Sequence, residues 1–347
     1  MFPVAEVRAK VVSLLEENLP PVLQHRAQAI LNLHMHPSNF VMTCMTQEEC
    51  HHLIHLLESN SCEEDVQRAI KFENVATLAG RLRVLVRTHL NRSGINHISQ
   101  GYWEKTLSPR ILNFTDSLSL DVDLAAIQNT LPVRWLEFAQ MHQDGTDKSR
   151  YHDARALRTL GTLCSRQDEL FRFIETSPGK LSAPKLVQKF GTSNIDLGWC
   201  RIMLGVMSGL KFLKETHTDV LRIISRDTLA YKEIHQLTKD CQNNISEYGY
   251  ALAASFLADM GSAFFVKDDT HVRDCMSALY PGMRTAESRV ERVIHEANLI
   301  GLTPRALDKL MYLPCSGNLY LLGLKLQNAP QMKASLLRYL ATFAEKV

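Results

Sequence analysis

Apolar residues recur at intervals of three and four along most of the chain, which is the spacing of one face of an α-helix. The first run contains Val7, Val11, Leu14 and Leu15, and it ends before a pair of prolines. Similar runs continue through much of the N-terminal third and repeatedly after residue 182. The pattern predicts a mostly α-helical protein. The stretch most typical of a β-strand, residues 111–122, is short and interrupted by Asp and Ser.

Capping residues and glycines mark the expected helix boundaries. Residues 183–190 are followed by Gly191 and residues 251–260 by Gly261, and glycine commonly terminates helices. Helix starts are marked by side chains that accept hydrogen bonds from the first helical N–H groups. We expect such caps at Thr46, Asp196, Asp219, Ser246, Asp268 or Asp269, and Thr303, which Pro304 follows.

Two loop-rich stretches divide the chain. Residues 91–117 contain several Asn, Gly and Pro residues in an otherwise helix-rich sequence, and residues 177–180 read Ser-Pro-Gly-Lys. We therefore predict an N-terminal helical region at 1–110, a connecting helical segment at 111–180 and a third helical domain at 181–347.

Composition is that of an ordinary globular protein, with 45% hydrophobic and 22% charged residues among 347. There is no membrane-spanning run and no secretory signal, so we expect a cytoplasmic or nucleoid-associated protein that keeps its eight cysteines reduced. No membrane partner is expected. A net charge of +2 neither requires nor excludes a nucleic-acid partner, because binding depends on a local basic face.

The most informative segment begins with residues 245–250, ISEYGY, and ends with residues 268–272, DDTHV. The residues between them are small and apolar, which predicts an intervening helix. An aspartate at a helix start is held ionised and fixed in direction by the free N–H groups there. Taken alone, Asp268 and Asp269 are most simply helix caps.

This arrangement resembles the helix-hairpin-helix DNA glycosylases, the superfamily that includes endonuclease III and the 8-oxoguanine glycosylases. Residues 269–272, Asp-Thr-His-Val, are similar to the Asp-Thr-His-Ile type sequence that carries the family's essential Asp. The family's hairpin ends in Gly-x-Gly and binds a DNA phosphate through backbone N–H groups; Gly249 matches its second glycine. The interval from Gly249 to Asp269 matches that of endonuclease III, and residues 301–317 resemble the closing segment of some members. The resemblance covers roughly residues 190–325.

The resemblance implies helix-hairpin-helix glycosylase-like helical domains, with residues 1–110 as an additional helical region. It also implies an enzyme that flips a modified or damaged base out of double-stranded DNA and hydrolyses its N-glycosidic bond. Asp269 is then the catalytic carboxylate, which stabilises positive charge on the sugar and orients the attacking water. The candidate pocket residues are Tyr250, Asp268 and Trp199, and the candidate DNA contacts are Ser246, Tyr248, Gly249, His271 and Arg273.

Two departures from the family pattern restrict the chemistry. The lyase lysine of bifunctional members would fall at Ala251 or Tyr250, and neither side chain has the amine that a Schiff base requires. We therefore expect monofunctional hydrolysis. Only Cys315 follows Cys275, so the four-cysteine iron–sulfur loop of endonuclease III is absent, and we expect no cofactor.

A third departure concerns DNA binding. Glu247 replaces the first hairpin glycine, and Ser246 replaces the proline before it. A glutamate beside a phosphate is repulsive. This leaves open a catalytically inactive nucleic-acid-binding or protein-interaction protein on the same all-α scaffold. The sequence gives no oligomeric state.

Other clusters of chemically active residues have simpler interpretations. Several His and Cys residues lie between residues 34 and 62, and His51 and His55 are one helical turn apart. No tight Cys-x-x-Cys pair accompanies them, so we interpret them as ordinary surface and core residues and not as a zinc site. We expect no metal. Three modest basic patches are candidate phosphate contacts or solvated helix faces: Arg81, Arg83, Arg87 and Arg92; Lys180, Lys185 and Lys189; and Arg284, Arg289 and Arg292.

Overall fold

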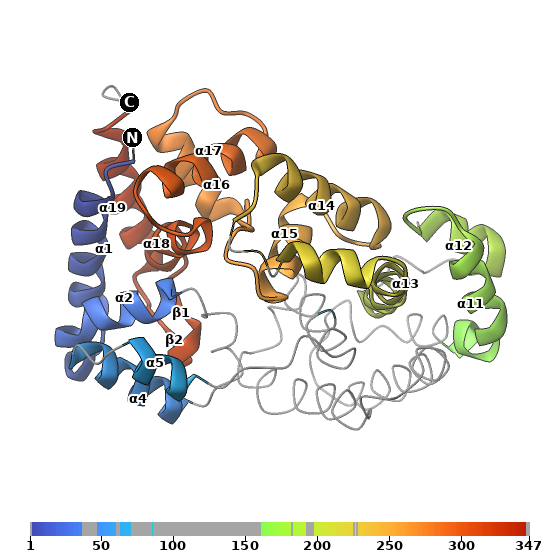
Figure 1. Ribbon diagram of the computed structural model, residues 1–347, viewed down its shortest axis with the longest axis horizontal. Coiled ribbons are helices and arrows are strands. Elements are labelled where there is room, and N and C mark those ends of the chain that lie inside the picture. Colours follow the sequence, from blue (N-terminus) through green and yellow to red (C-terminus); the bar gives the residue numbers. More distant parts are fainter. Residues whose placement is uncertain are drawn as a thin grey trace. The chain divides into compact units, whose positions relative to one another are not determined.

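The computed structural model describes residues 2–36, 47–59, 63–70, 85, 161–181, 183–191, 198–224, 226 and 228–344. These residues are mostly helical, as the apolar pattern predicts (Figure 1). The sequence did not predict a short antiparallel pair of strands, β1 (Asn318–Leu319) and β2 (Leu324–Lys325), in which Asn318 lies opposite Lys325. The predicted strand at 111–122 lies outside the described residues.

The chain forms two compact units. The first combines residues 1–73, 225–235 and 257–347, and the second combines residues 74–224 and 236–256. This grouping differs from the predicted boundaries at residues 110 and 180, because the predicted domain 181–347 contributes to both units. The boundaries were drawn from composition along the chain, whereas the units arise because apolar helix faces distant in sequence pack together.

The helices and turns of the first unit come from both ends of the chain. They are α1 (Val4–Asn18), η1 (Pro21–Arg26), α2 (Ala27–Met35), α4 (Gln47–Glu58), α5 (Glu63–Ala69), α16 (Thr270–Leu279), α17 (Ala286–Leu299), α18 (Pro304–Ser316), η3 (Tyr320–Leu322) and α19 (Ala329–Ala341). The second unit contains α11 (Gln167–Thr176), α12 (Ala183–Phe190) and α13 (Gly198–Ile224). Parts of α14 (Tyr231–Asn244) and α15 (Tyr250–Asp259) belong to each unit.

Helix α18 is the central element of the first unit, where it contacts α1, α2, α16, α17 and α19. Its start agrees with the prediction: the Thr303 side chain accepts a hydrogen bond from Ala306 N at 3.1 Å, and Pro304 follows. It ends at Gly317, whose φ of 61° is the left-handed conformation of a C-cap glycine. Burial of each large apolar side chain on this helix contributes about 1.5–3 kcal/mol.

The first predicted helix is confirmed as α1. Its apolar residues Val7, Val11, Leu14 and Leu15 are all buried, and the helix packs on α2, α18 and α19 (Figure 1). The start of the chain is therefore part of the core formed by its last helices.

A buried carboxylate anchors this N-terminal segment. Glu296 of α17 is fully buried; it accepts hydrogen bonds from Phe2 N and from the Tyr280 hydroxyl at 2.6 Å, and it pairs with Arg292 at 2.6 Å. Burial alone would raise the pKa of Glu296. The hydrogen bonds from Tyr280 and Phe2 outweigh it, so the pKa is lowered from its ordinary value.

The Glu296 carboxylate predicts a specific dependence of stability on pH. A carboxyl whose pKa is lower in the folded state adds stability above its unfolded pKa, and this stability is lost as the pH falls through the folded pKa. We expect Glu296→Gln to reduce the free energy of unfolding by about 1.5–3 kcal/mol near neutral pH. Urea unfolding near neutral pH and well below the ordinary pKa of Glu measures the change. A loss that is equal in both conditions would contradict the assignment.

In the second unit, α11 and α13 are joined by a lysine that caps a helix end. Lys211 Nζ donates hydrogen bonds to the carbonyls of Ile174, Glu175 and Ser177 at 2.9–3.1 Å, where the last carbonyls of α11 lack helical partners. The predicted helix at 183–190 is confirmed as α12, and Gly191 ends it with φ of 68°.

The predicted helix start at Asp219 is wrong, because α13 runs unbroken through this position. Val220 and Ile224 are buried, so they continue the apolar face that begins earlier in α13. This packing outweighs the preference of Asp for helix starts. The other predicted caps at Thr46 and Asp196 lie outside the described residues.

Candidate active site

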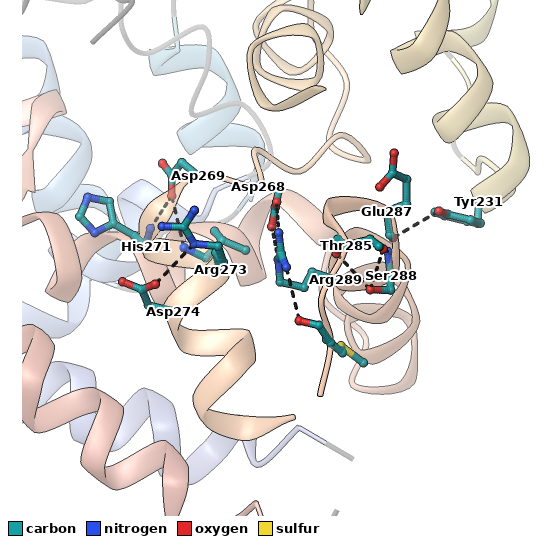
Figure 2. Close-up of polar contacts among 12 residues, drawn as sticks. Tyr231, Asp268, Asp269, His271, Arg273, Asp274, Thr285, Glu287, Ser288 and Arg289 are labelled. Carbon is teal, nitrogen blue, oxygen red and sulfur yellow. Dashed lines mark hydrogen bonds and ion pairs between the residues drawn. The ribbon is translucent and has the colours of Figure 1, made fainter. Parts of the chain in front are cut away.

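Asp269 lies at the start of α16, and its side chain caps the helix. Its Oδ1 accepts hydrogen bonds from His271 N at 2.9 Å and Val272 N at 3.2 Å (Figure 2). One oxygen therefore satisfies two of the N–H groups that a helix start leaves without partners. Within the described part of the chain, Oδ2 makes one contact, a 4.0 Å ion pair with Lys267 Nζ. One oxygen therefore fixes the carboxylate, while the other accepts no hydrogen bond from the described residues.

The neighbouring Asp268 has a different role. Its two oxygens accept hydrogen bonds from Arg289 Nε at 2.8 Å and Nη2 at 2.7 Å, in a bidentate pair whose side chains are 5% and 7% exposed. Figure 2 shows the adjacent aspartates facing different partners. Asp268 therefore joins α16 to α17 and holds the segment in which Asp269 is oriented.

The structure places a second group of ionisable residues in the first unit, which the sequence analysis did not select. Arg305, Asp308, Lys309 and Tyr312 share one side of α18, and we call them the α18 polar face. Arg305, Asp308 and Lys309 are only 6%, 1% and 8% exposed. The arginine pairs with Asp259 at 3.0 Å, whereas Lys309 Nζ is 3.9 Å from Asp308 Oδ2. Charged residues are seldom buried this deeply, so the face is a candidate functional site.

Burial moves two groups of this face toward their neutral forms. It lowers the pKa of Lys309 to about 8, with the Arg305 charge acting in the same direction. It also raises the pKa of Asp308 above its ordinary value, although the charges of Lys309 and Arg305 oppose this. The Asp269 charge adds to the rise at Asp308, so the α16 start and the α18 polar face influence each other electrostatically.

Aromatic rings connect the α18 polar face to the start of α16. The His271 ring meets Tyr312 edge to face, with centroids 5.5 Å apart. Lys309 Nζ lies 4.8 Å from the centroid of Tyr312 and 5.5 Å from that of Tyr320, which places the amine near two ring faces. Burial lowers the pKa of His271, although the charge of Asp269 opposes this, so the neutral imidazole is favoured.

The segment that was predicted to form the hairpin lies in the second unit. Residues 245–249 connect α14 to α15, and Tyr248 N donates a hydrogen bond to Ile245 O across the turn. Among the described residues, Glu247 is the one non-glycine residue with positive φ, at 70°. A side chain in this conformation costs on the order of 1–2 kcal/mol relative to glycine. The backbone therefore adopts, at Glu247, the conformation that glycine favours.

Contacts inside the second unit fasten this turn. Ser246 N donates to Ser208 Oγ at 2.8 Å, and Ser246 Oγ donates to Leu181 O at 2.9 Å. Lys180 Nζ donates to Tyr248 O at 2.7 Å. Ser246 is therefore not the cap of α15, which begins at Tyr250, because the Ser246 hydroxyl is hydrogen-bonded to Leu181 O.

The other predicted hairpin residues differ in accessibility. Tyr248 is buried, with its ring 5.7 Å from that of Phe256, and Tyr250 is buried with Lys239 Nζ 5.4 Å from its ring centroid. The side chains of Ser246 and Tyr248 thus lie inside the second unit, and their backbone N–H groups already donate to Ser208 Oγ and Ile245 O. Gly249 is exposed, and a Cβ atom there would meet nothing within 4 Å.

Two further candidates lie on helices. Arg273 is half exposed on α16 and forms an ion pair with Asp274 at 3.6 Å. Trp199 is in α13, and its side chain lies outside the described ones.

The basic patch predicted at Arg284, Arg289 and Arg292 is wrong. Arg289 is buried against Asp268, and Arg292 pairs with Glu296. The first pair was not visible in the sequence, because Asp268 is 21 residues from Arg289 along the chain. In the patch predicted at Lys180, Lys185 and Lys189, Lys180 donates to Tyr248 O and Lys189 pairs with Glu169 at 3.4 Å. The patch predicted at residues 81–92 lies outside the described side chains.

The described residues contain no group of three or more His, Cys, Asp or Glu side chains that could hold a metal ion. In the same residues, every helix is too short or too polar to cross a bilayer. Comparison with protein-family models, curated proteins and solved structures finds no match for this chain.

Proposed function

We propose that the protein is a DNA glycosylase-like enzyme that flips a modified or damaged base from double-stranded DNA and hydrolyses its N-glycosidic bond. The observation that carries the proposal is the geometry of Asp269. Its Oδ1 is held by two helical N–H groups, and its Oδ2 has only a 4.0 Å contact with Lys267 among the described residues. Such a carboxylate is oriented before the reaction, as electrostatic stabilisation of a sugar cation requires.

The same carboxylate supports hydrolysis by water. Breaking the N-glycosidic bond gives the sugar oxocarbenium character, which a nearby ionised carboxylate stabilises while it orients the attacking water. Neither Tyr250 nor Ala251 has an amine, so the step proceeds without a covalent intermediate at these positions. In this hydrolysis, water supplies a hydroxyl to the sugar carbon and a proton to the departing base.

The hairpin supports the DNA-binding part of the proposal. Glu247 occupies the position of the family's first hairpin glycine and has a φ of 70°, which is a glycine-like conformation. Gly249 is exposed with open space around its Cα, so a phosphate can approach the backbone at the start of α15. The left-handed backbone at position 247 therefore supports a glycine-like turn despite the change of residue type.

A second function is favoured by the charge of Glu247. A carboxylate on the turn that would receive a phosphate weakens DNA binding, which favours a catalytically inactive nucleic-acid-binding or protein-interaction protein. The two functions are distinguished by incubating the wild-type protein with duplexes that each carry one modified base, followed by alkali cleavage at abasic sites. Strand cleavage supports the enzyme. Salt-dependent binding without cleavage on any duplex supports the binding protein.

Substitutions of Glu247 test the hairpin separately from catalysis. We expect Glu247→Gln, which removes the charge, to tighten DNA binding severalfold at low salt, because a like charge near a phosphate is lost. Glu247→Gly removes the same charge and also relieves the left-handed strain, so it should additionally raise stability by about 1 kcal/mol. Fluorescence anisotropy with a labelled duplex and urea unfolding measure the two effects. Unchanged DNA affinity in both variants would place the phosphate elsewhere.

A further inference from the structure

Several polar atoms near the α18 polar face are buried without hydrogen-bond partners among the described residues. They belong to α18, to the strand and turn that follow it, and to the start of α16. The atoms are Arg305 Nε, Asp308 Oδ2, Asn318 Oδ1, the Tyr320 hydroxyl and His271 Nδ1. Most buried polar groups in folded proteins are paired, so such a concentration in one region indicates a site for another polar molecule.

The charges of this region are balanced. Arg305 is matched by Asp259 at 3.0 Å, and Lys309 is matched by Asp308 at 3.9 Å. A site with balanced charges favours neither an anion nor a cation, so its ligand is neutral.

The polar atoms and rings of the site define the ligand further. Asp308 Oδ2 and Asn318 Oδ1 are acceptors, whereas Arg305 Nε and the Tyr320 hydroxyl are donors. The rings of Tyr312 and Tyr320 lie beside these groups and meet edge to face, with centroids 6.5 Å apart, and aromatic neighbours of this kind favour a planar ligand. A nucleobase has this combination of a flat ring with donors and acceptors on one edge.

We propose that the α18 polar face, together with Asn318 and Tyr320, binds a neutral planar heterocycle with donors and acceptors on its edge. Its identification as the base that the enzyme removes rests on the proposed function. Asp308 and Tyr320 then determine which base is accepted, because a buried polar group that the ligand leaves unpaired costs binding free energy.

The test measures binding of free bases, without DNA and without turnover. Isothermal titration with adenine, guanine, cytosine, thymine and uracil is expected to show saturable binding of at least one base to the wild-type protein. Tyr320→Phe, which removes only a hydroxyl, is expected to weaken that binding about fivefold. Tyr339→Phe is the matched control, because Tyr339 lies on α19 with its ring beside Phe343. This control should bind like the wild type.

Asp308→Asn provides a second variant of nearly unchanged shape. It replaces an acceptor by an amide with donors, so it is expected to weaken the preferred base by about tenfold or to change which base binds best. The proposal is overturned if no base binds, or if the Tyr320 and Asp308 variants bind as the Tyr339 control does. In that case water satisfies the buried polar atoms.

Each of the two proposals can be excluded by experiment while the other is retained. Binding of a free base by a wild-type protein that releases none from DNA would exclude the glycosylase and retain the heterocycle site. Release of a base from DNA without Tyr320-dependent binding of any free base would retain the enzyme and exclude this site.

Discussion

Asp269→Asn is expected to lower the rate of base release by about 10²- to 10³-fold, the usual cost of removing one oriented electrostatic stabiliser. Asparagine removes the negative charge that faces the sugar cation but keeps an oxygen that caps α16, since Asn and Asp are equally good N-caps. The Oδ1 contacts with His271 N and Val272 N can therefore persist. Single-turnover cleavage assays and urea unfolding measure the rate and the stability.

The control for this substitution is Asp274→Asn. Asp274 lies on the same helix, is 33% exposed and pairs with Lys333 at 2.6 Å, so the variant removes the same charge from α16 away from its start. It should retain wild-type activity. If Asp269→Asn keeps full activity with unchanged stability, Asp269 is only a helix cap and the catalytic carboxylate is elsewhere.

Arg289→Ala is expected to destabilise the protein by about 3–5 kcal/mol, the usual cost of breaking a buried ion pair by removing one partner. The bidentate pair with Asp268 is 5–7% exposed, so the substitution would leave a buried carboxylate without its cation. Urea unfolding measures the change. The same variant should also lower activity, because Asp268 precedes Asp269 and joins α16 to α17.

An exposed ion pair in the same unit provides the matched control. Arg226 and Glu233 are separated by 2.5 Å but are about 40% exposed at each side chain. Arg226→Ala should therefore cost no more than about 1 kcal/mol. The double variant Asp268→Ala/Arg289→Ala should cost less than the sum of its single substitutions, since it leaves no unpaired charge. Additive losses would mean that the two residues act independently.

Features encoded locally were predictable from the sequence. The apolar face of α1, the cap and proline at the start of α18, the glycine that ends α12 and the cap at Asp269 all depend on residues within one or two helical turns. Asp268 and Asp269 were equivalent candidates for the cap, and only the structure distinguishes them. The difference arises from Arg289, which is distant in sequence and binds Asp268.

The α18 polar face was not predictable in the same way. Arg305, Asp308 and Lys309 have the pattern of a solvated helix surface, and their burial results from the packing of α2, α16 and α19 around α18. The same reason explains part of the incorrect basic patch, because Arg289 has an acidic partner, Asp268, that only the packed helices bring close. The grouping of chain segments into two units likewise depends on packing between segments that are distant in sequence.

Hydrophobic periodicity and capping act over a few residues, so the amino-acid pattern was sufficient to predict the helical class, many helix ends and an aspartate at the start of α16. Packing of the helices determines which of the two aspartates caps that helix, which charges are buried and which chain segments form each unit. These properties depend on contacts between residues far apart in the chain, and a linear pattern does not contain them.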